Sequence, residues 1–199
     1  MWFGEVDRPT LVLGSTQSEA AFDRRRTEAA GVDVVRRRSG GGAVLLRPGE
    51  IVWADVFLPA RDPLADVDVG RAFGWVGRAW ARALAGLGVD SPAVHEGPPR
   101  ESAWSATVCF AGLGPGEVTM GGAKVVGISQ RRTRVGALFQ CGALVSWDPR
   151  PLVDLLALPD GAGPEWREQT AAALAPVAAG TGISRARLVA AFEGALNSA

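Results

Sequence analysis

The sequence has no tyrosine and only one histidine, one lysine and two cysteines among its 199 residues. One histidine and two cysteines cannot supply the four ligands of a structural zinc site. The 21 Lys and Arg residues balance the 21 Asp and Glu residues, which argues against a broadly basic nucleic-acid-binding protein. We therefore expect no metal site and no nucleic-acid partner.

Long apolar runs are also missing. No stretch approaches the roughly 18 residues that a membrane span requires, and the N-terminus lacks the charged and apolar regions of a signal peptide. We expect a cytoplasmic protein without membrane contact, in which Cys109 and Cys141 are thiols rather than a disulfide. The length predicts a single domain over residues 1–199, with a helical C-terminal end over 148–199.

Apolar periodicity predicts an α/β (α+β) fold with a mixed, mainly antiparallel sheet flanked by helices. Strands are expected at residues 9–14, 32–38, 43–46, 51–58, 94–96, 104–111, 117–120, from 123 onward, and at 134–145. Helices are expected at residues 16–30, with a capping box from Thr16 to Glu19, and at 68–88, 149–157, 164–175 and 185–197. The strand at 51–58 contains one acid, Asp55, whose carboxylate must find a partner or a cation.

The single lysine, Lys124, stands in a chain with 20 arginines. Arginine is a planar fork, whereas lysine is a compact ammonium that acts as a point charge. Glycines at 121 and 122 predict a tight hairpin, which places Lys124 near the start of a strand, on one face with Val126, Ile128 and Gln130. We expect the ammonium of Lys124 to take part in the reaction. We also expect Lys124 to lie where the strand enters from the surface, so that Lys124→Met would leave the fold intact. The alternative is a stray lysine in an arginine-rich composition.

Three consecutive glycines, Gly40, Gly41 and Gly42, follow Ser39 between two expected strands. Glycine is costly in backbone entropy. A loop whose amides approach a ligand closely explains that cost, and a plain hairpin bend is the alternative. The loop is not a Walker loop, because no Gly-Lys-Ser/Thr follows it, and it opens no helix as a dinucleotide fingerprint would.

Two motifs together resemble the lipoate and biotin protein ligase superfamily. They are Arg-Arg-Arg-Ser-Gly-Gly-Gly-Ala-Val at residues 36–44 and Gly-Ala-Lys-Val-Val-Gly-Ile-Ser-Gln-Arg-Arg at 122–132. Their order, spacing and flanking strands resemble that catalytic domain over residues 9–147. The resemblance implies a class II synthetase-like biotin/lipoate protein ligase catalytic domain, which passes lipoate or octanoate to a lysine of a lipoyl carrier domain. Such carriers are the glycine cleavage H protein and the dehydrogenase E2 subunits.

The resemblance also implies which residues meet the ligand. Lys124 is expected to contact the acyl carbonyl and the phosphate. The remaining ligand-binding residues implied by the two motifs are Arg37, Arg38, Ser39, Gly40, Gly41, Gly42, Ala43, Gly127, Ser129 and Gln130.

Three functions stay open. A lipoate-protein ligase uses ATP and Mg²⁺ to form an acyl-adenylate, from which the carrier lysine displaces AMP. An octanoyltransferase needs no cofactor, and relatives of that kind resemble this chain in having Cys-Phe 15 residues before the lysine, as Cys109 stands before Lys124. There the cysteine forms an acyl thioester, and the lysine lowers its pKa. The third function is a non-catalytic lipoyl-ligand binder or partner subunit. The three-glycine form of the loop resembles ligases, and also one transferase branch, more than the cysteine transferases that have arginine at its third position, and on this resemblance we favour the ligase.

Overall fold

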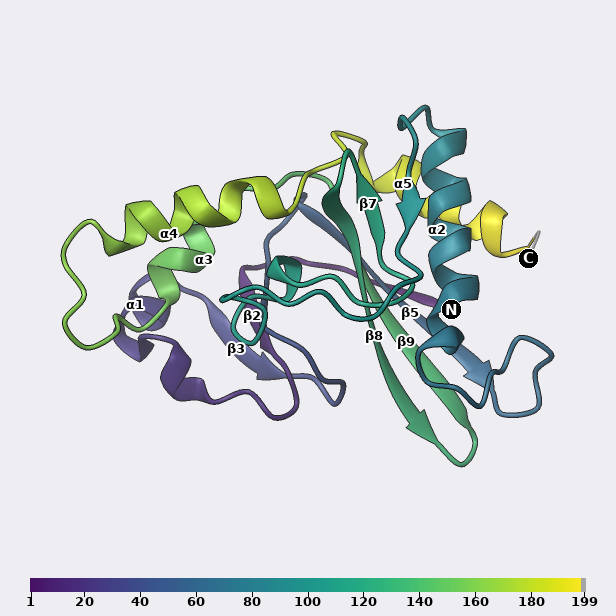
Figure 1. Cartoon of the computed structure of the whole chain (residues 1–199), viewed down its shortest axis with the longest axis horizontal. Coiled ribbons are helices and arrows are strands. Elements are labelled where there is room, and N and C mark those ends of the chain that lie inside the picture. The colour runs from purple at the N-terminus through teal and green to yellow at the C-terminus, as the bar shows by residue number, and fades with distance from the viewer. Residues whose placement is uncertain (198–199) are drawn as a thin grey trace.

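The computed structural model describes residues 1–197 and contains two sheets (Figure 1). The larger sheet has the strand order β1-β5-β9-β8-β7-β6, and all neighbours in it are antiparallel. Its strands are β1 (Trp2–Gly4), β5 (Ile51–Pro59), β6 (Ala93–Val94), β7 (Val118–Met120), β8 (Ala123–Thr133) and β9 (Gly136–Leu144). The smaller sheet contains β2 (Thr10–Leu13), β3 (Asp33–Arg36) and β4 (Val44–Leu46), with β2 parallel to β3 and antiparallel to β4. The expected mixed, mainly antiparallel α/β fold is confirmed, whereas β1 was not predicted.

Helices cover two separate parts of the molecule (Figure 1). The bounds are α1 (Arg24–Ala29), α2 (Gly74–Gly86), α3 (Arg150–Leu155), α4 (Trp166–Leu174) and α5 (Arg185–Leu196). Helices α2 and α5 pack on one face of the large sheet, where Trp80 stacks on Phe192 with ring centroids 3.8 Å apart. Helices α1, α3 and α4 lie with the small sheet around a second core. No helix in the described part of the chain is long and apolar enough to cross a membrane.

The two faces of the large sheet differ in character, because successive side chains of a strand point to opposite faces. The face covered by α2 and α5 is apolar and includes Val52, Ala54, Val56, Ile128, Phe139, Cys141 and Ala143. On the other face, the register aligns Asp55 of β5, Gln140 of β9 and Ser129 of β8 in one row. We call this second side the polar face. Side chains on this face can form hydrogen bonds with a ligand.

A bulge in β8 decides which face Lys124 reaches. The register between β7 and β8 shifts so that Val125 is an extra residue between Lys124 and Val126. Such an insertion moves the preceding side chain to the opposite face. The Cε atom of Lys124 accordingly lies 3.2 Å from the Cβ position of Gly127, on the polar face. The expectation that Lys124 shares a face with Val126 and Ile128 is therefore wrong.

The segment that carries the first cysteine is not a strand. Residues 104–111 were expected to be extended, but they form turns and the 3-10 helix η3 (Cys109–Ala111). The hydroxyl groups of Ser102 and Ser105 both donate to the carbonyl of Ala111, at 2.8 and 3.2 Å. Local side-chain hydrogen bonds of this kind compete with sheet pairing and curl the segment.

The first helix is also shorter than expected. The predicted helix over residues 16–30 is divided into the 3-10 helix η1 (Glu19–Ala21) and α1. Ser18 caps η1 and Asp23 caps α1, each by accepting a backbone hydrogen bond. The capping box predicted at Thr16 is therefore wrong. Helix α2 likewise begins six residues later than expected.

Candidate active site

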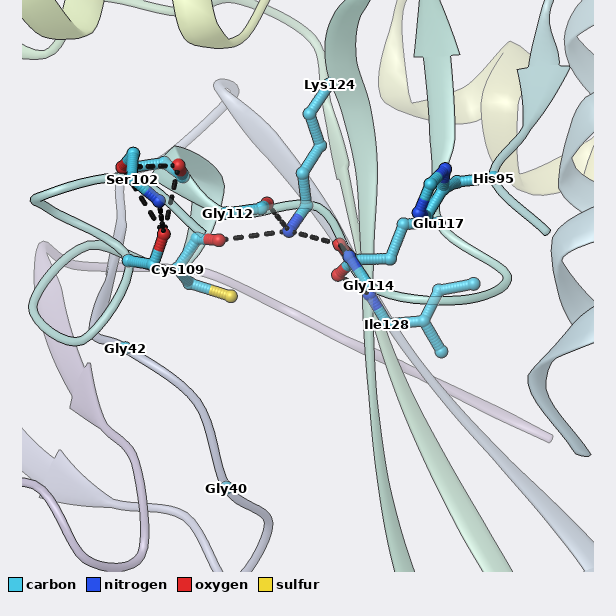
Figure 2. A network of polar contacts seen from close by, with 12 residues as sticks. Gly40, Gly42, His95, Ser102, Cys109, Gly112, Gly114, Glu117, Lys124 and Ile128 are labelled. Atoms are coloured by element: carbon cyan, nitrogen blue, oxygen red, sulfur yellow. Dashed lines mark hydrogen bonds and ion pairs between the residues drawn. The ribbon is translucent and has the colours of Figure 1, made fainter. Parts of the chain in front are cut away.

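Lys124 ends in a buried ion pair on the polar face. Its Nζ lies 2.7 Å from Oε2 of Glu117, and the two side chains are only 3% and 6% exposed. The ammonium also donates to the carbonyls of Cys109 and Gly112, both at 2.9 Å, and stands 5.2 Å from the ring centre of Phe110. Its three N–H donors thus all have acceptors (Figure 2). We call the buried ion pair of Lys124 and Glu117 the clamp. Lys124 is therefore not the surface-entering side chain that the sequence predicted.

The carboxylate of Glu117 joins the loop before β7 to strand β8. Its Oε2 accepts from the amide of Gly114 at 2.6 Å, and its Oε1 accepts from the amide of Ile128 at 3.0 Å. Hydrogen bonds to an ionised carboxylate are stronger than those between neutral groups. Sequence reasoning missed Glu117. The available signal was that no other acidic residue lies within 20 positions of Lys124.

Two facing glycines make room for the clamp. Gly127 of β8 and Gly142 of β9 are paired in register. A Cβ atom on Gly127 would lie 3.2 Å from Cε of Lys124 and 3.5 Å from Cζ of Phe110. A Cβ atom on Gly142 would lie 3.1 Å from Cδ1 of Ile51. A larger residue at position 127 would displace the Lys124 side chain, and one at position 142 would displace Ile51.

Cys109 lies beside the clamp and is partly exposed. Its amide donates to the carbonyl of Ala43 at 2.9 Å, and the amide of Ala43 donates to Thr107 at 2.8 Å. Gly42 packs directly against this segment, because its Cβ position is 2.8 Å from the nitrogen of Cys109. The glycine loop and the cysteine segment are therefore one structural unit, which Lys124 holds through the Cys109 carbonyl.

Arg37 holds the glycine loop from the inside. Its side chain is buried, and it donates to the carbonyls of Gly40 and Gly42 at 2.7 and 2.8 Å and to that of Val12 at 3.3 Å. Burial lowers the pKa of Arg37, and Cys109 opposes this shift only in part. The amides of the three loop glycines donate to no residue in the described part of the chain. They are available to an oxyanion or a phosphate oxygen.

Ser39 connects the glycine loop to the polar face. Its buried hydroxyl lies 2.9 Å from the hydroxyl of Ser129 and donates to Oε1 of Gln140 at 2.8 Å. Gln140 in turn donates to Asp55 at 3.3 Å, and Trp53 donates to the same oxygen at 3.0 Å. Burial raises the pKa of Asp55, and these two hydrogen bonds oppose the rise. The expected partners of Asp55 are thus neutral donors.

The expected ligand-binding residues are only partly brought together. Those that the structure gathers around the clamp and the loop are Arg37, Ser39, Gly40, Gly41, Gly42, Ala43, Cys109, Lys124, Gly127 and Ser129. Arg38 is exposed on the same loop. Gln130 points to the opposite face of β8, where it accepts from Arg132 at 3.1 Å and lines a cavity of about 190 Å³.

A cavity of about 330 Å³ lies over the polar face. Its lining includes Val12, Arg37, Trp53, Asp55 and Gln140. This volume is at the small end of the range for small-molecule sites. Larger cavities, of about 580 and 650 Å³, lie beside α4 and beside α2, and neither Cys109 nor Lys124 lines any of these three cavities.

Comparison with known proteins identifies relatives of this arrangement. A family model for the lipoyl protein ligase A/B catalytic domain matches residues 1–197. The octanoyltransferase LipM of Kyrpidia tusciae is 32% identical over 158 residues, which cover 77% of this chain and 57% of that protein. The chain therefore spans little more than half the length of this curated relative.

Solved structures share the fold. The bipartite lipoate protein ligase of Thermoplasma acidophilum superposes with a TM-score of 0.69 at 20% identity, over 96% of this chain and 68% of that one. A lipoate-protein ligase A bound with ATP superposes with a TM-score of 0.65 at 18% identity, over 96% and 68%. These similarities confirm the expected lipoate ligase type of fold.

The two cysteines should differ in reactivity. Cys109 is partly exposed, whereas Cys141 is buried in the core and burial raises its pKa to about 12. Titration with dithionitrobenzoate at pH 8 should label one thiol in the folded protein and the second only after denaturation. The fast reaction should vanish in Cys109→Ser and persist in Cys141→Ser. Two fast thiols in the native protein would contradict this assignment.

Glycines 40 and 42 should tolerate alanine differently. A Cβ on Gly42 would meet backbone atoms at 2.8 Å, whereas a Cβ on Gly40 would meet nothing within 4 Å. Gly42→Ala should destabilise the protein by about 1–3 kcal/mol, and Gly40→Ala should change stability by less than about 0.5 kcal/mol. Urea unfolding measures both. Equal losses of stability in the two variants would show that the contact between Gly42 and the cysteine segment does not require a glycine.

The buried ion pair should behave as a coupled unit. Lys124→Met and Glu117→Gln should each cost about 3–5 kcal/mol, because each leaves a charge buried without its partner. The double variant should lose clearly less than the sum of the two single losses in urea unfolding. The exposed pair Arg24 and Glu28, 2.8 Å apart, is the control, and the losses of its two single variants should add. Additive losses at the buried pair would contradict the clamp.

Proposed function

The chain belongs to the lipoyl protein ligase A/B catalytic-domain family, and we propose that it transfers an octanoyl or lipoyl group to a carrier-domain lysine through an acyl thioester on Cys109. The name octanoyltransferase of a relative with 32% identity supports acyl transfer without ATP. We thus prefer the transferase to the ligase, whereas the three-glycine loop alone favours the ligase.

The geometry around Cys109 carries the proposal. A cysteine nucleophile needs access to the substrate and surroundings that favour negative charge. Cys109 is partly exposed, and its segment is hydrogen-bonded to the glycine loop through Ala43. The loop amides are free to receive an oxyanion, and Lys124 fixes the backbone on which the thiol stands. Buried Cys141 has none of these features.

In the proposed first step, the Cys109 thiolate attacks the carbonyl carbon of an octanoyl thioester. A carbon–sulfur bond to Cys109 forms, the carbon–sulfur bond to the donor breaks, and the donor leaves as a thiolate. In the second step, the unprotonated amine of the carrier lysine attacks the Cys109 thioester, an amide forms, the thiolate is released, and the surplus proton of the nitrogen passes to water. Both steps create an oxyanion, which backbone amides of the glycine loop can bind. Lys124 positions the nucleophile by holding its carbonyl.

The acceptor in this proposal is a lipoyl carrier domain, such as the glycine cleavage H protein or a dehydrogenase E2 subunit. One structural neighbour is a bipartite lipoate protein ligase described together with its E2 lipoyl domain. The reaction requires no metal and no nucleic acid, and we assign it to the cytoplasm.

An ATP-dependent ligase is the second candidate. The free amides of the glycine loop suit phosphate oxygens as well as an oxyanion, and the fold is shared with an ATP-bound ligase. ATP with Mg²⁺ would supply the adenylyl group in that reaction. Lys124 suits this role less well, because its three donors are already taken. Contact with an adenylate would leave the buried carboxylate of Glu117 without its cation.

Intact-mass measurement distinguishes the two reactions. The protein is incubated with an octanoyl carrier protein in one sample and with octanoate, ATP and Mg²⁺ in another, followed by an apo lipoyl domain. We expect a thioester adduct on the protein with the octanoyl carrier alone, loss of the adduct and of transfer in Cys109→Ser, and retention of both in Cys141→Ser. Octanoylation of the lipoyl domain that needs ATP and is unimpaired in Cys109→Ser would overturn the transferase and leave the ligase.

A further inference from the structure

Gln130 carries an amide group whose donors are unused. Its side chain lies on the face of β8 opposite to the clamp, and its Oε1 accepts from Nε of Arg132 at 3.1 Å. Because arginine offers only donors, this contact fixes which end of the amide is oxygen. Nε2 is buried and has no hydrogen-bond partner in the described part of the chain. Buried donors in folded proteins almost always have an acceptor, so this nitrogen indicates a missing group.

Gln130 lines the cavity of about 190 Å³ on this face of the sheet. Two cross-strand rows form one side of the cavity: Gln130 is paired with Phe139, and Arg132 is paired with Ala137. Leu58 of β5 extends the second row. The volume is below the range of about 300–1,000 Å³ that drug-sized ligands occupy. The cavity therefore suits a small molecule that combines an apolar body with a group accepting hydrogen bonds.

Arg132 brings a positive charge to the same cavity. Its hydrogen-bond partners are the Gln130 amide oxygen and three backbone carbonyls, all of which are neutral. The nearby acids Asp66 and Asp68 lie 3.0 and 3.7 Å from Arg71 instead. No salt bridge found within residues 1–197 includes Arg132. A carboxylate is therefore the strongest acceptor that Gln130 and Arg132 could share.

A loop held by Arg132 forms another wall of the cavity. Residues 60–70 lead from β5 to the 3-10 helix η2 (Arg71–Phe73), and residues 65–67 line the cavity. Arg132 donates to the carbonyls of residues 66, 67 and 68, at 2.7, 3.0 and 3.3 Å. The side chain of Val67 is 92% exposed and so does not anchor the loop. Because a carboxylate binds arginine more strongly than neutral carbonyls do, it can replace these contacts and reach Nε2.

We propose that this cavity binds a short-chain carboxylate. The carboxylate oxygens accept from Nε2 of Gln130 and from the guanidinium of Arg132, and the alkyl chain lies against Leu58, Ala72 and Phe139. The site is on the face of β8 opposite to the clamp, and neither Cys109 nor Lys124 lines it. It is therefore separate from the site of acyl transfer.

Titration of the unmodified, ¹⁵N-labelled protein with hexanoate tests the proposal by NMR spectroscopy. The side-chain amide of Gln130 and the backbone amide of Val67 should shift together and saturate. Hexanamide has the same chain but a neutral head, and it should bind about tenfold more weakly or less. Hexanoate that shifts the cysteine segment but leaves Gln130 unchanged would overturn the proposal, and so would equal affinity for hexanamide.

Three variants test the two donors. Gln130→Leu removes the amide at similar volume, Arg132→Gln removes the charge, and Arg134→Gln is the matched control in the exposed turn after β8. The Kd for hexanoate is measured from the Val67 shift, so binding at another site does not contribute. It should rise about tenfold or more in the first two variants and stay within about twofold in the control. An unchanged Kd in folded Gln130→Leu or Arg132→Gln protein would refute the site.

Discussion

The buried ion pair between Lys124 and Glu117 is the interaction on which the rest of the site depends. Moving two charges out of water costs several kcal/mol per ion, and their attraction offsets that cost only when the remaining hydrogen-bonding groups are satisfied. Here the ammonium has two carbonyl acceptors besides the carboxylate, and the carboxylate accepts two backbone amides. That arrangement exists only when the cysteine segment, the loop before β7 and strand β8 meet at one point. The pair therefore determines where Cys109 stands.

Backbone irregularities in the large sheet allow the cysteine segment, the loop before β7 and strand β8 to come together. The extra residue Val125 turns Lys124 to the polar face, and Gly127 leaves space for its side chain. From the other side, the guanidinium of Arg37 gathers carbonyls of the glycine loop, which packs on the cysteine segment. A partly exposed thiol is thus held between two buried cations with different tasks. Lys124 fixes the backbone of the cysteine segment, and Arg37 fixes the glycine loop.

The sequence was informative where local rules decide the structure. Gly121 and Gly122 both have positive φ, 57° and 87°, as the predicted hairpin requires, and the two motifs led to the correct family. The cysteine segment was predicted as a strand because its apolar run resembles one, whereas serine hydrogen bonds to a carbonyl curl it. The side of the sheet that Lys124 occupies could not be predicted, because the bulge depends on pairing with β7 and a Lys-Val-Val run is typical of a regular strand. Glu117 could have been found by asking which acid neutralises a lysine aimed at the interior.

Hydrogen–deuterium exchange of the Glu117→Gln protein tests the central claim most directly, because it reports the position of the cysteine segment without an activity assay. The amides of Cys109 and Leu113 donate to Ala43 and Arg100, at 2.9 and 3.0 Å. We predict that these amides exchange about tenfold faster or more in the variant, while strand β9 in the sheet core keeps its protection. Unchanged exchange at the cysteine segment, or equal acceleration throughout the large sheet, would contradict the view that this ion pair holds the nucleophile in place.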